Sequence, residues 1–205
     1  MNNITISNLN FSYSTKKIFD NAQFQIKKET INRIEGMNGV GKTTLFNILS
    51  DNIEAQVSIT PKQEFEFITN EFMQFNELTG NEIILLFFSV NKRKLTECEE
   101  FIKFFLDLNL NSVLKNRYKD MSLGEKQKLK ILVSFINKEK IVLLDEPFNA
   151  LDQNSKIVLS QLFKQLAINY NRTIIYISHN DVEKYIDKIF KIYDKKIFEM
   201  TERKK

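Results

Sequence analysis

The stretch that decides the fold is Gly36-Met37-Asn38-Gly39-Val40-Gly41-Lys42-Thr43-Thr44, which has the form G-x-x-x-x-G-K-[ST]. It follows the strand-like run Thr30–Glu35 and leads into the helix-like run Leu45–Leu49. Glycines let such a loop curl, so that successive N–H groups point at a polyphosphate with the positive end of a helix dipole behind it. The pattern predicts a phosphate-binding loop; the alternative is a glycine-rich turn that binds nothing.

Two residues of this loop carry side-chain chemistry. We expect Lys42 to reach the β- and γ-phosphates of a nucleotide and the Thr43 hydroxyl to bind Mg²⁺. The remaining expected nucleotide contacts are Asn38, Gly39, Val40, Gly41 and Thr44.

Length and composition limit the class of protein. The chain has 205 residues, 42% of them hydrophobic and 27% charged, which is ordinary for one globular α/β domain. The formal net charge of +4 is small and the basic residues are scattered, so we expect no nucleic-acid partner. The single Cys98 excludes an internal disulfide and fits a reducing compartment.

Membrane-spanning and targeting segments are not expected. The longest purely apolar run, Ile83–Phe88, is far shorter than the roughly 20 residues that span a bilayer. The start, Met1-Asn2-Asn3, lacks the charged and apolar regions of a signal peptide.

Strand-like patterns surround the loop. Apolar residues alternate over Ile4–Tyr13, with a slip near Ser7-Asn8, and again at Phe24 and Ile26, which predicts antiparallel strands. Two further strands are predicted at 57–60 and 65–69. Tyr13 either packs in the core or stacks on a base, and the residues alone favour the core.

The middle of the chain changes to a helical pattern. From about Thr79 to Asn137 we expect an inserted helical subdomain within a single domain, 1–205, because no linker or repeat separates it. The sequence Ser122-Leu123-Gly124-Glu125 predicts a capping box at the start of the last of these helices. Its N–H groups either serve only that cap or also bind an anion.

Two apolar strands end in polar residues. Ile141–Leu144 leads into Asp145 and Glu146, and 173–177 leads into Ser178 and His179. Sites in α/β proteins form beyond the carboxyl ends of parallel strands. We expect Asp145 to hold Mg²⁺, Glu146 to act on the attacking water, and His179 to contact the γ-phosphate.

In this order, the motifs resemble those of the ATP-binding cassette (ABC) ATPases over essentially the whole chain. Residues 36–44 correspond to Walker A, 141–145 to Walker B, 149–152 to the D-loop with Asp152, and 121–127 to the signature. The resemblance makes Glu146 the catalytic glutamate, His179 the switch histidine and Tyr13 the adenine-stacking aromatic.

The resemblance implies a P-loop NTPase fold: a mainly parallel core sheet, an N-terminal antiparallel β subdomain and the helical subdomain. It also implies ATP and Mg²⁺ as cofactors. The residue that couples the nucleotide to the membrane partner and contacts Mg²⁺ is placed at Asn70, with Glu71 and Gln74 as alternatives. Leu123 stands where the common signature has glycine, and this variant is similar to small drug and bacteriocin-immunity exporters.

The resemblance further implies an ATPase that drives export of a peptide or drug through a separately encoded transmembrane permease. The chain would lie at the cytoplasmic side of the cell membrane, peripheral through that partner. Two cassettes, identical or related, would pair head to tail, with Ser122 and Gly124 of one closing on the phosphate held by Lys42 of the other. The alternatives are a cytosolic cluster-assembly ATPase that transports nothing and a regulatory module that binds ATP with little turnover.

Overall fold

The computed structural model describes residues 3–68, 75–94, 106–111, 113–137, 140–178 and 185–200. In chain order the elements are β1 (Asn3–Tyr13), β2 (Lys16–Lys27), β3 (Ile31–Glu35), α1 (Lys42–Leu49), β4 (Gln56–Thr60), β5 (Phe65–Phe67), α2 (Gly80–Val90), the 3₁₀ turn η3 (Tyr118–Asp120), α4 (Leu123–Ser134), β6 (Ile141–Asp145), α5 (Gln153–Asn169), β7 (Ile174–Ile177), β8 (Lys188–Tyr193) and β9 (Lys196–Met200).

Among the described residues, the larger sheet has six strands in the order β5-β6-β7-β3-β8-β9. Neighbours are parallel except that β9 runs antiparallel to β8. Both faces of β6 are buried: Val142 and Leu144 face the core that includes α2, α4 and α5, whereas Ile141 and Leu143 face the core around α1. This double burial explains the continuous apolar run and confirms the predicted parallel core sheet.

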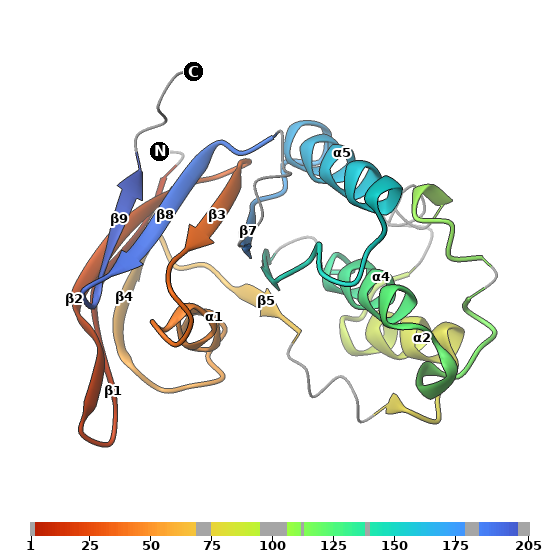
Figure 1. Ribbon diagram of the computed structural model, residues 1–205, viewed down its shortest axis with the longest axis horizontal. Coiled ribbons are helices and arrows are strands. Elements are labelled where there is room, and N and C mark those ends of the chain that lie inside the picture. The colour runs from red at the N-terminus through yellow and green to blue at the C-terminus, as the bar shows by residue number, and fades with distance from the viewer. Residues whose placement is uncertain are drawn as a thin grey trace.

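The smaller sheet is antiparallel and pairs the described strands in the order β2-β1-β4. It covers α1 on one side of the molecule, and the helices α2, α4 and α5 lie on the other side (Figure 1). The pairing of β1 with β2 shifts between Ile6 and Leu9, and Asn8 has φ +54°. A bulge at this point is the physical cause of the slip in the alternating sequence pattern.

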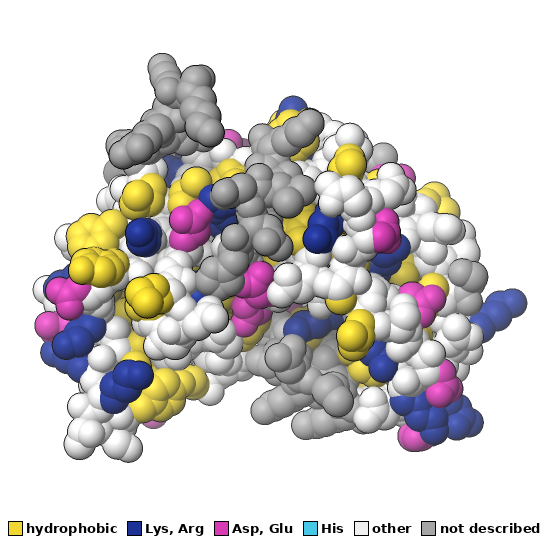
Figure 2. Space-filling model, viewed as in Figure 1, with side chains coloured by type: hydrophobic (Ala, Val, Ile, Leu, Met, Phe, Trp, Pro, Cys, Tyr) yellow, Lys and Arg dark blue, Asp and Glu magenta, His cyan; other side chains and the backbone are white. Residues whose placement is uncertain are grey.

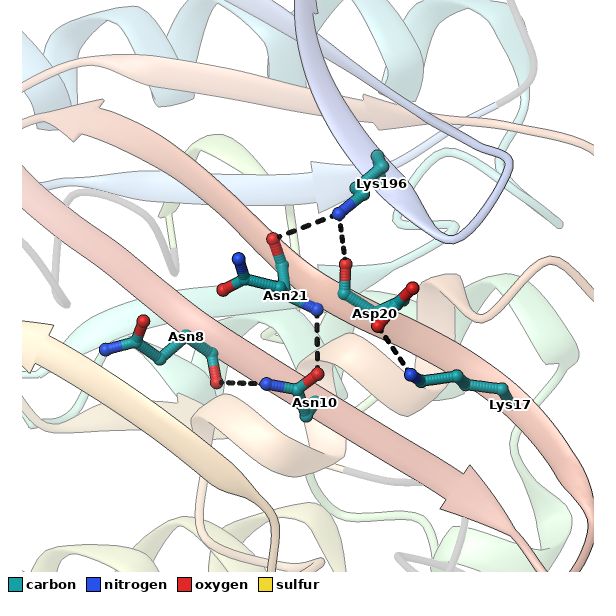
Figure 3. Close-up of polar contacts among 6 residues, drawn as sticks. All are labelled: Asn8, Asn10, Lys17, Asp20, Asn21 and Lys196. Atoms are coloured by element: carbon teal, nitrogen blue, oxygen red, sulfur yellow. Dashed lines mark hydrogen bonds and ion pairs between the residues drawn. The ribbon is translucent and has the colours of Figure 1, made fainter.

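Asparagine side chains hold this irregular pairing together (Figure 3). The Asn10 amide donates to the Asn8 carbonyl at 3.1 Å, and its oxygen accepts from the Asn21 N–H at 2.8 Å. From β9, the Lys196 ammonium group reaches the carbonyls of Asp20 and Asn21. Through Lys196, β9 of the core sheet is hydrogen-bonded to β2 of the antiparallel sheet.

The helical part contains α2, η3 and α4 between β5 and β6, where a helical insertion was expected, so the predicted fold class is confirmed. The predicted capping box is present: the Glu125 N–H donates to Ser122 Oγ at 3.3 Å, and the Ser122 N–H donates to Glu125 Oε2 at 2.8 Å. Within the expected helical subdomain, residues 95–105 lie outside the described residues. No helix in the described ranges is both long and apolar enough to cross a membrane.

Candidate functional site

The loop before α1 has backbone conformations that only glycine adopts readily. Gly41 has φ +114°, and a Cβ there would lie 2.5 Å from Ile18 Cγ2, so a larger residue would collide with the β1–β2 hairpin. Gly39 has φ +73° and a Cβ added to it would meet no atom within 4 Å. Gly41 caps α1 without a side chain, which leaves the N–H groups of the first turn directed at the loop.

Lys42 lies folded over this loop. Its Nζ donates to the Gly36 carbonyl at 2.7 Å and the Met37 carbonyl at 3.1 Å. Burial lowers the pKa of Lys42, and the carboxylates of Glu146 and Asp145 oppose that shift. The ammonium group therefore lies at the loop, within the electrostatic influence of two acidic side chains. The phosphate oxygens of a bound polyphosphate could replace the two carbonyl oxygens as its hydrogen-bond acceptors.

Thr43 and Asp145, 102 positions apart in the chain, meet at this loop. The Thr43 hydroxyl donates to Asp145 Oδ2 at 2.8 Å. A hydroxyl and a carboxylate are hard oxygen ligands of the type that Mg²⁺ takes alongside water and phosphate oxygens. This pair therefore fits the expected cation.

Glu146 follows directly and has φ +49°, uncommon for a side chain with Cβ. Its N–H donates to the Ile177 carbonyl at 3.0 Å, and its own carbonyl accepts from the Asn149 N–H at 3.1 Å and from Gln127 Nε2 at 3.2 Å. These bonds fix a sharp turn at the end of β6. The turn keeps the Glu146 side chain at the site instead of letting it continue along the strand.

A cavity of about 520 Å³ joins these groups. Its lining residues are Tyr13, Lys16, Ile18, Asn38, Gly39, Gly41, Lys42, Thr43, Thr44, Asp145, Glu146 and Ile177. Tyr13 is 48% exposed and stands edge-on to Phe11 at 4.8 Å, so its ring is open to the cavity rather than packed in the core. The residues alone had favoured the core for Tyr13, and that interpretation is wrong.

Three lining residues were not anticipated from the sequence. Lys16 pairs with Tyr13 across the β1–β2 hairpin, Ile18 packs against the loop glycine Gly41, and Ile177 ends β7. The hairpin register would have indicated Lys16, since it lies directly opposite the aromatic residue. Nothing in the local pattern of Ile18 or Ile177 distinguishes them from core residues.

Val40 differs from the other loop residues. Its side chain packs against the core around α1, and its N–H donates to the Met37 carbonyl at 3.3 Å. Val40 is not part of the cavity lining. Its expected contact with nucleotide stays a prediction.

The residues predicted to act from a second subunit do not line this cavity. Ser122 is engaged in its capping box, and Gly124 lies against the Ala150 carbonyl, where an added Cβ would be 2.9 Å from the oxygen. Asp152 caps α5, accepting from the Ser155 N–H at 2.9 Å and its hydroxyl at 2.6 Å, which lowers the Asp152 pKa. The predicted Asn70, its alternatives Glu71 and Gln74, and His179 lie outside the described residues.

Residues 19–149, well over half of the chain, match the family described as ABC transporter. The chain belongs to this family. Like other ABC cassettes, it is an ATP-binding ATPase. The predicted membership of the ABC ATPases is thereby confirmed.

Relatives in several bacteria share about a third of the residues. The lipoprotein-releasing system ATP-binding protein LolD of Buchnera aphidicola is 30% identical over 97% of this chain and 98% of its own length. The zinc import ATP-binding protein ZnuC of Ehrlichia ruminantium is 31% identical over 86% of the chain and 74% of its own. A lacticin-481 transport/processing ATP-binding protein of Lactococcus lactis is 32% identical over 96% of the chain, which spans only 30% of that longer protein.

Solved ABC cassettes have the same fold. A dimeric structure of the bacterial cassette MJ0796 superposes with a TM-score of 0.82 at 21% identity, covering 97% of this chain and 98% of that one. The ADP conformation of the cassette MJ1267 gives a TM-score of 0.76 at 18% identity, over 98% and 92% of the two chains.

Proposed function

We propose that this ABC ATPase hydrolyses Mg²⁺-bound ATP to drive export of a peptide or drug through a separately encoded transmembrane subunit. The observation that carries the chemical part is the convergence of Lys42, Thr43, Asp145 and Glu146 on one cavity that the exposed Tyr13 also lines. A nucleoside triphosphate needs both kinds of residue, because its phosphates take cations and N–H donors while its base takes an aromatic face.

Each residue of the proposed site has one task. Tyr13 stacks on the adenine, and Lys42 leaves the Gly36 and Met37 carbonyls to bind phosphate oxygens. Thr43 and Asp145 hold Mg²⁺, which when bound neutralises phosphate charge. Glu146 orients the attacking water and accepts its proton, and His179 contacts the γ-phosphate.

Ser122 and Gly124 require a second cassette in this proposal. They start α4 and do not line the cavity of their own chain, so the proposal assigns them to the cavity of a second cassette. A head-to-tail pair, with the same chain or a related one, would bring the α4 N-terminus of each subunit to the cavity of the other. The existence of a dimeric structure of a similarly folded cassette supports this arrangement.

Export is supported by the relative whose name concerns lacticin-481 transport and by the Leu123 signature variant. Relatives named for zinc import are equally similar in sequence, so direction depends on the partner. The chain would sit at the cytoplasmic face of the membrane, peripheral through its permease, with residues 79–137 passing the motion of the dimer to that partner.

The test is recovery of the partner from membranes. A tagged Glu146→Gln variant, expressed in the organism that encodes the chain, is solubilised in mild detergent with ATP and Mg²⁺ and its companions are identified by mass spectrometry. A hydrophobic permease in stoichiometric amount supports the proposal, and the tagged Lys42→Ala variant serves as the nucleotide-free control. Recovery with soluble companions alone would favour the cluster-assembly alternative.

A further inference from the structure

One face of α4 packs against the segment that follows β6, residues 146–150. Gly124 lies against the Ala150 carbonyl, with 2.9 Å from its would-be Cβ to the oxygen, and Gln127 Nε2 donates to the Glu146 carbonyl at 3.2 Å. Lys130 comes three residues later on the same face and is attracted by the Asp145 carboxylate. The helix therefore runs antiparallel to residues 145–150, with its second and third turns nearest the end of β6.

Lys130 occupies an unusual position for a lysine. Its side chain is half-buried, and α4 buries Leu129 and Ile131 on either side of it. Burial lowers the Lys130 pKa, and the Asp145 carboxylate counteracts this by favouring the charged form. An ammonium group that is partly buried acts on a nearby charge through a medium of lower dielectric constant, so its electrostatic effect is larger than that of a surface lysine.

The carboxylate that attracts Lys130 is the same one that Thr43 fixes. Asp145 Oδ2 accepts the Thr43 hydroxyl proton at 2.8 Å. Asp145 thus lies between the phosphate-binding loop on one side and α4 on the other. A positive charge on the α4 side opposes a second cation at Asp145, because like charges repel in a medium that water only partly screens.

We propose that Lys130 is a positioning residue that acts through Asp145: from α4 it attracts this carboxylate and thereby lowers the affinity of the Thr43–Asp145 pair for Mg²⁺. The proposal rests on the proposed function only in taking that pair as the magnesium site. It gives the helix that starts at Ser122 a direct electrostatic link to the metal. A shift of α4 along residues 145–150 would change the affinity for Mg²⁺ without touching the nucleotide.

The experiment measures metal binding rather than turnover. The purified protein is saturated with ADP and titrated with Mn²⁺, whose free concentration is followed by electron paramagnetic resonance, and Mg²⁺ is then used to displace it. Lys130→Met removes the charge and retains the length of the side chain. We expect it to bind Mn²⁺ and Mg²⁺ about ten-fold more tightly, with ADP affinity in EDTA unchanged because Lys130 does not line the cavity.

Three further variants make the result specific. Lys130→Arg keeps the charge and should bind the metal like the wild type. Lys128→Met removes a charge that acts on Asp152 instead, and should also bind like the wild type. In an Asp145→Asn background, Lys130→Met should lose its effect, since a double-mutant cycle reports coupling between the two side chains.

The outcomes separate this proposal from the proposed function. If the wild type shows no Mn²⁺ binding that depends on ADP and Asp145, the magnesium site itself is wrong and both proposals fall. If it shows such binding but Lys130→Met matches the wild type, only the role of Lys130 is overturned. Should Lys130→Met fail to fold, Lys130→Gln is measured in the same way and judged by the same criterion.

Discussion

At the scale of single residues, the backbone at the end of β6 matters as much as the side chains. Glu146 adopts φ +49°, and bonds to Ile177, Asn149 and Gln127 hold it there. Such a conformation costs energy that the surrounding bonds must offset, and residues of this kind concentrate at functional sites. The same turn brings Asp145 and Glu146, adjacent in sequence, to the same cavity.

Glu146→Gln should separate binding from hydrolysis. The amide keeps the size and the backbone bonds of Glu146 but accepts no proton from water, so we expect kcat to fall at least about 100-fold. The Kd for Mg²⁺-ATP should stay within about two-fold, because binding is assigned to Lys42, Thr43 and Tyr13. Phosphate release and fluorescent-nucleotide titration provide the two measurements, and unchanged turnover would remove Glu146 from its role as base.

Gly124→Ala tests the close approach of α4 to Ala150. The added Cβ would lie 2.9 Å from a backbone oxygen, so the start of the helix must move. Because this site lies away from the cavity lining, we expect ATP affinity to be kept and turnover to fall about ten-fold. Gly39→Ala is the contrasting variant: its Cβ meets no atom within 4 Å, but φ +73° disfavours alanine in the phosphate-binding loop, so it should weaken ATP binding instead.

At the scale of elements, the segment between β6 and α5 is anchored by one aromatic side chain. Phe148 is 3% exposed, with ring centroids 5.8 Å from Phe163 and 5.7 Å from Tyr176. It thereby fastens the turn that carries Glu146 to α5 and β7. These contacts explain why a large aromatic residue stands at position 148, which the sequence pattern alone did not indicate.

Phe148→Ala should lower the free energy of unfolding by about 3–5 kcal/mol, since it removes a buried ring and leaves a cavity. Urea denaturation followed by circular dichroism measures this. Leu123→Ala, at a position 75% exposed, should change the free energy of unfolding by less than about 0.5 kcal/mol. A loss below about 1 kcal/mol for Phe148→Ala would mean that the segment is not held by this contact.

The cap of α5 gives a pH dependence with a defined sign. Bonds from the Ser155 hydroxyl and N–H lower the pKa of Asp152 in the folded state. The stabilisation is therefore fully present above the ordinary aspartate pKa and is lost as the pH falls through the lowered value. In Asp152→Asn the cap remains but cannot titrate, so the stability difference from wild type should change only below about pH 4. A difference that is constant from pH 6 to pH 2 would contradict this.

At the scale of the whole molecule, the residues of the proposed site fall into two groups: those that line the cavity, and Ser122 and Gly124 at the start of α4, which do not line it. The cavity lies at the junction of the antiparallel sheet, α1 and the core sheet, whereas Ser122 starts a helix of the helical part (Figure 1). On the face shown in Figure 2, Lys and Arg side chains are dispersed rather than gathered in one patch. Completion of the site by a second cassette is consistent with this division.

Glu146→Gln should therefore form a dimer that depends on ATP. Light scattering on a sizing column should give a monomer without nucleotide and a dimer with ATP and Mg²⁺. A second variant that adds Ser122→Ala should dimerise more weakly, because the Ser122 hydroxyl is proposed to reach the partner's nucleotide. A monomer with ATP demonstrably bound would mean that this chain pairs with a related cassette or closes only on its permease.

The sequence by itself determined the loop, the parallel strands, the capping box and the family. Each of these is written in local patterns: glycine spacing in 36–41, an uninterrupted apolar run in 141–144, and Ser122 three residues before Glu125. Backbone sterics and hydrogen bonding act over a few residues, so such features can be predicted without knowing what packs against them.

Only the tertiary structure decided which residues share the cavity and which face each other across it. Lys16 and Ile18 line the cavity because β2 begins there, Ile177 lines it because β7 ends there, and Val40 is absent from the lining, with its side chain packed against the core around α1. The electrostatic effect of Asp145 on Lys130 depends on the register of α4 along residues 145–150. Contacts of this kind arise from packing between elements distant in sequence, and no local pattern encodes them.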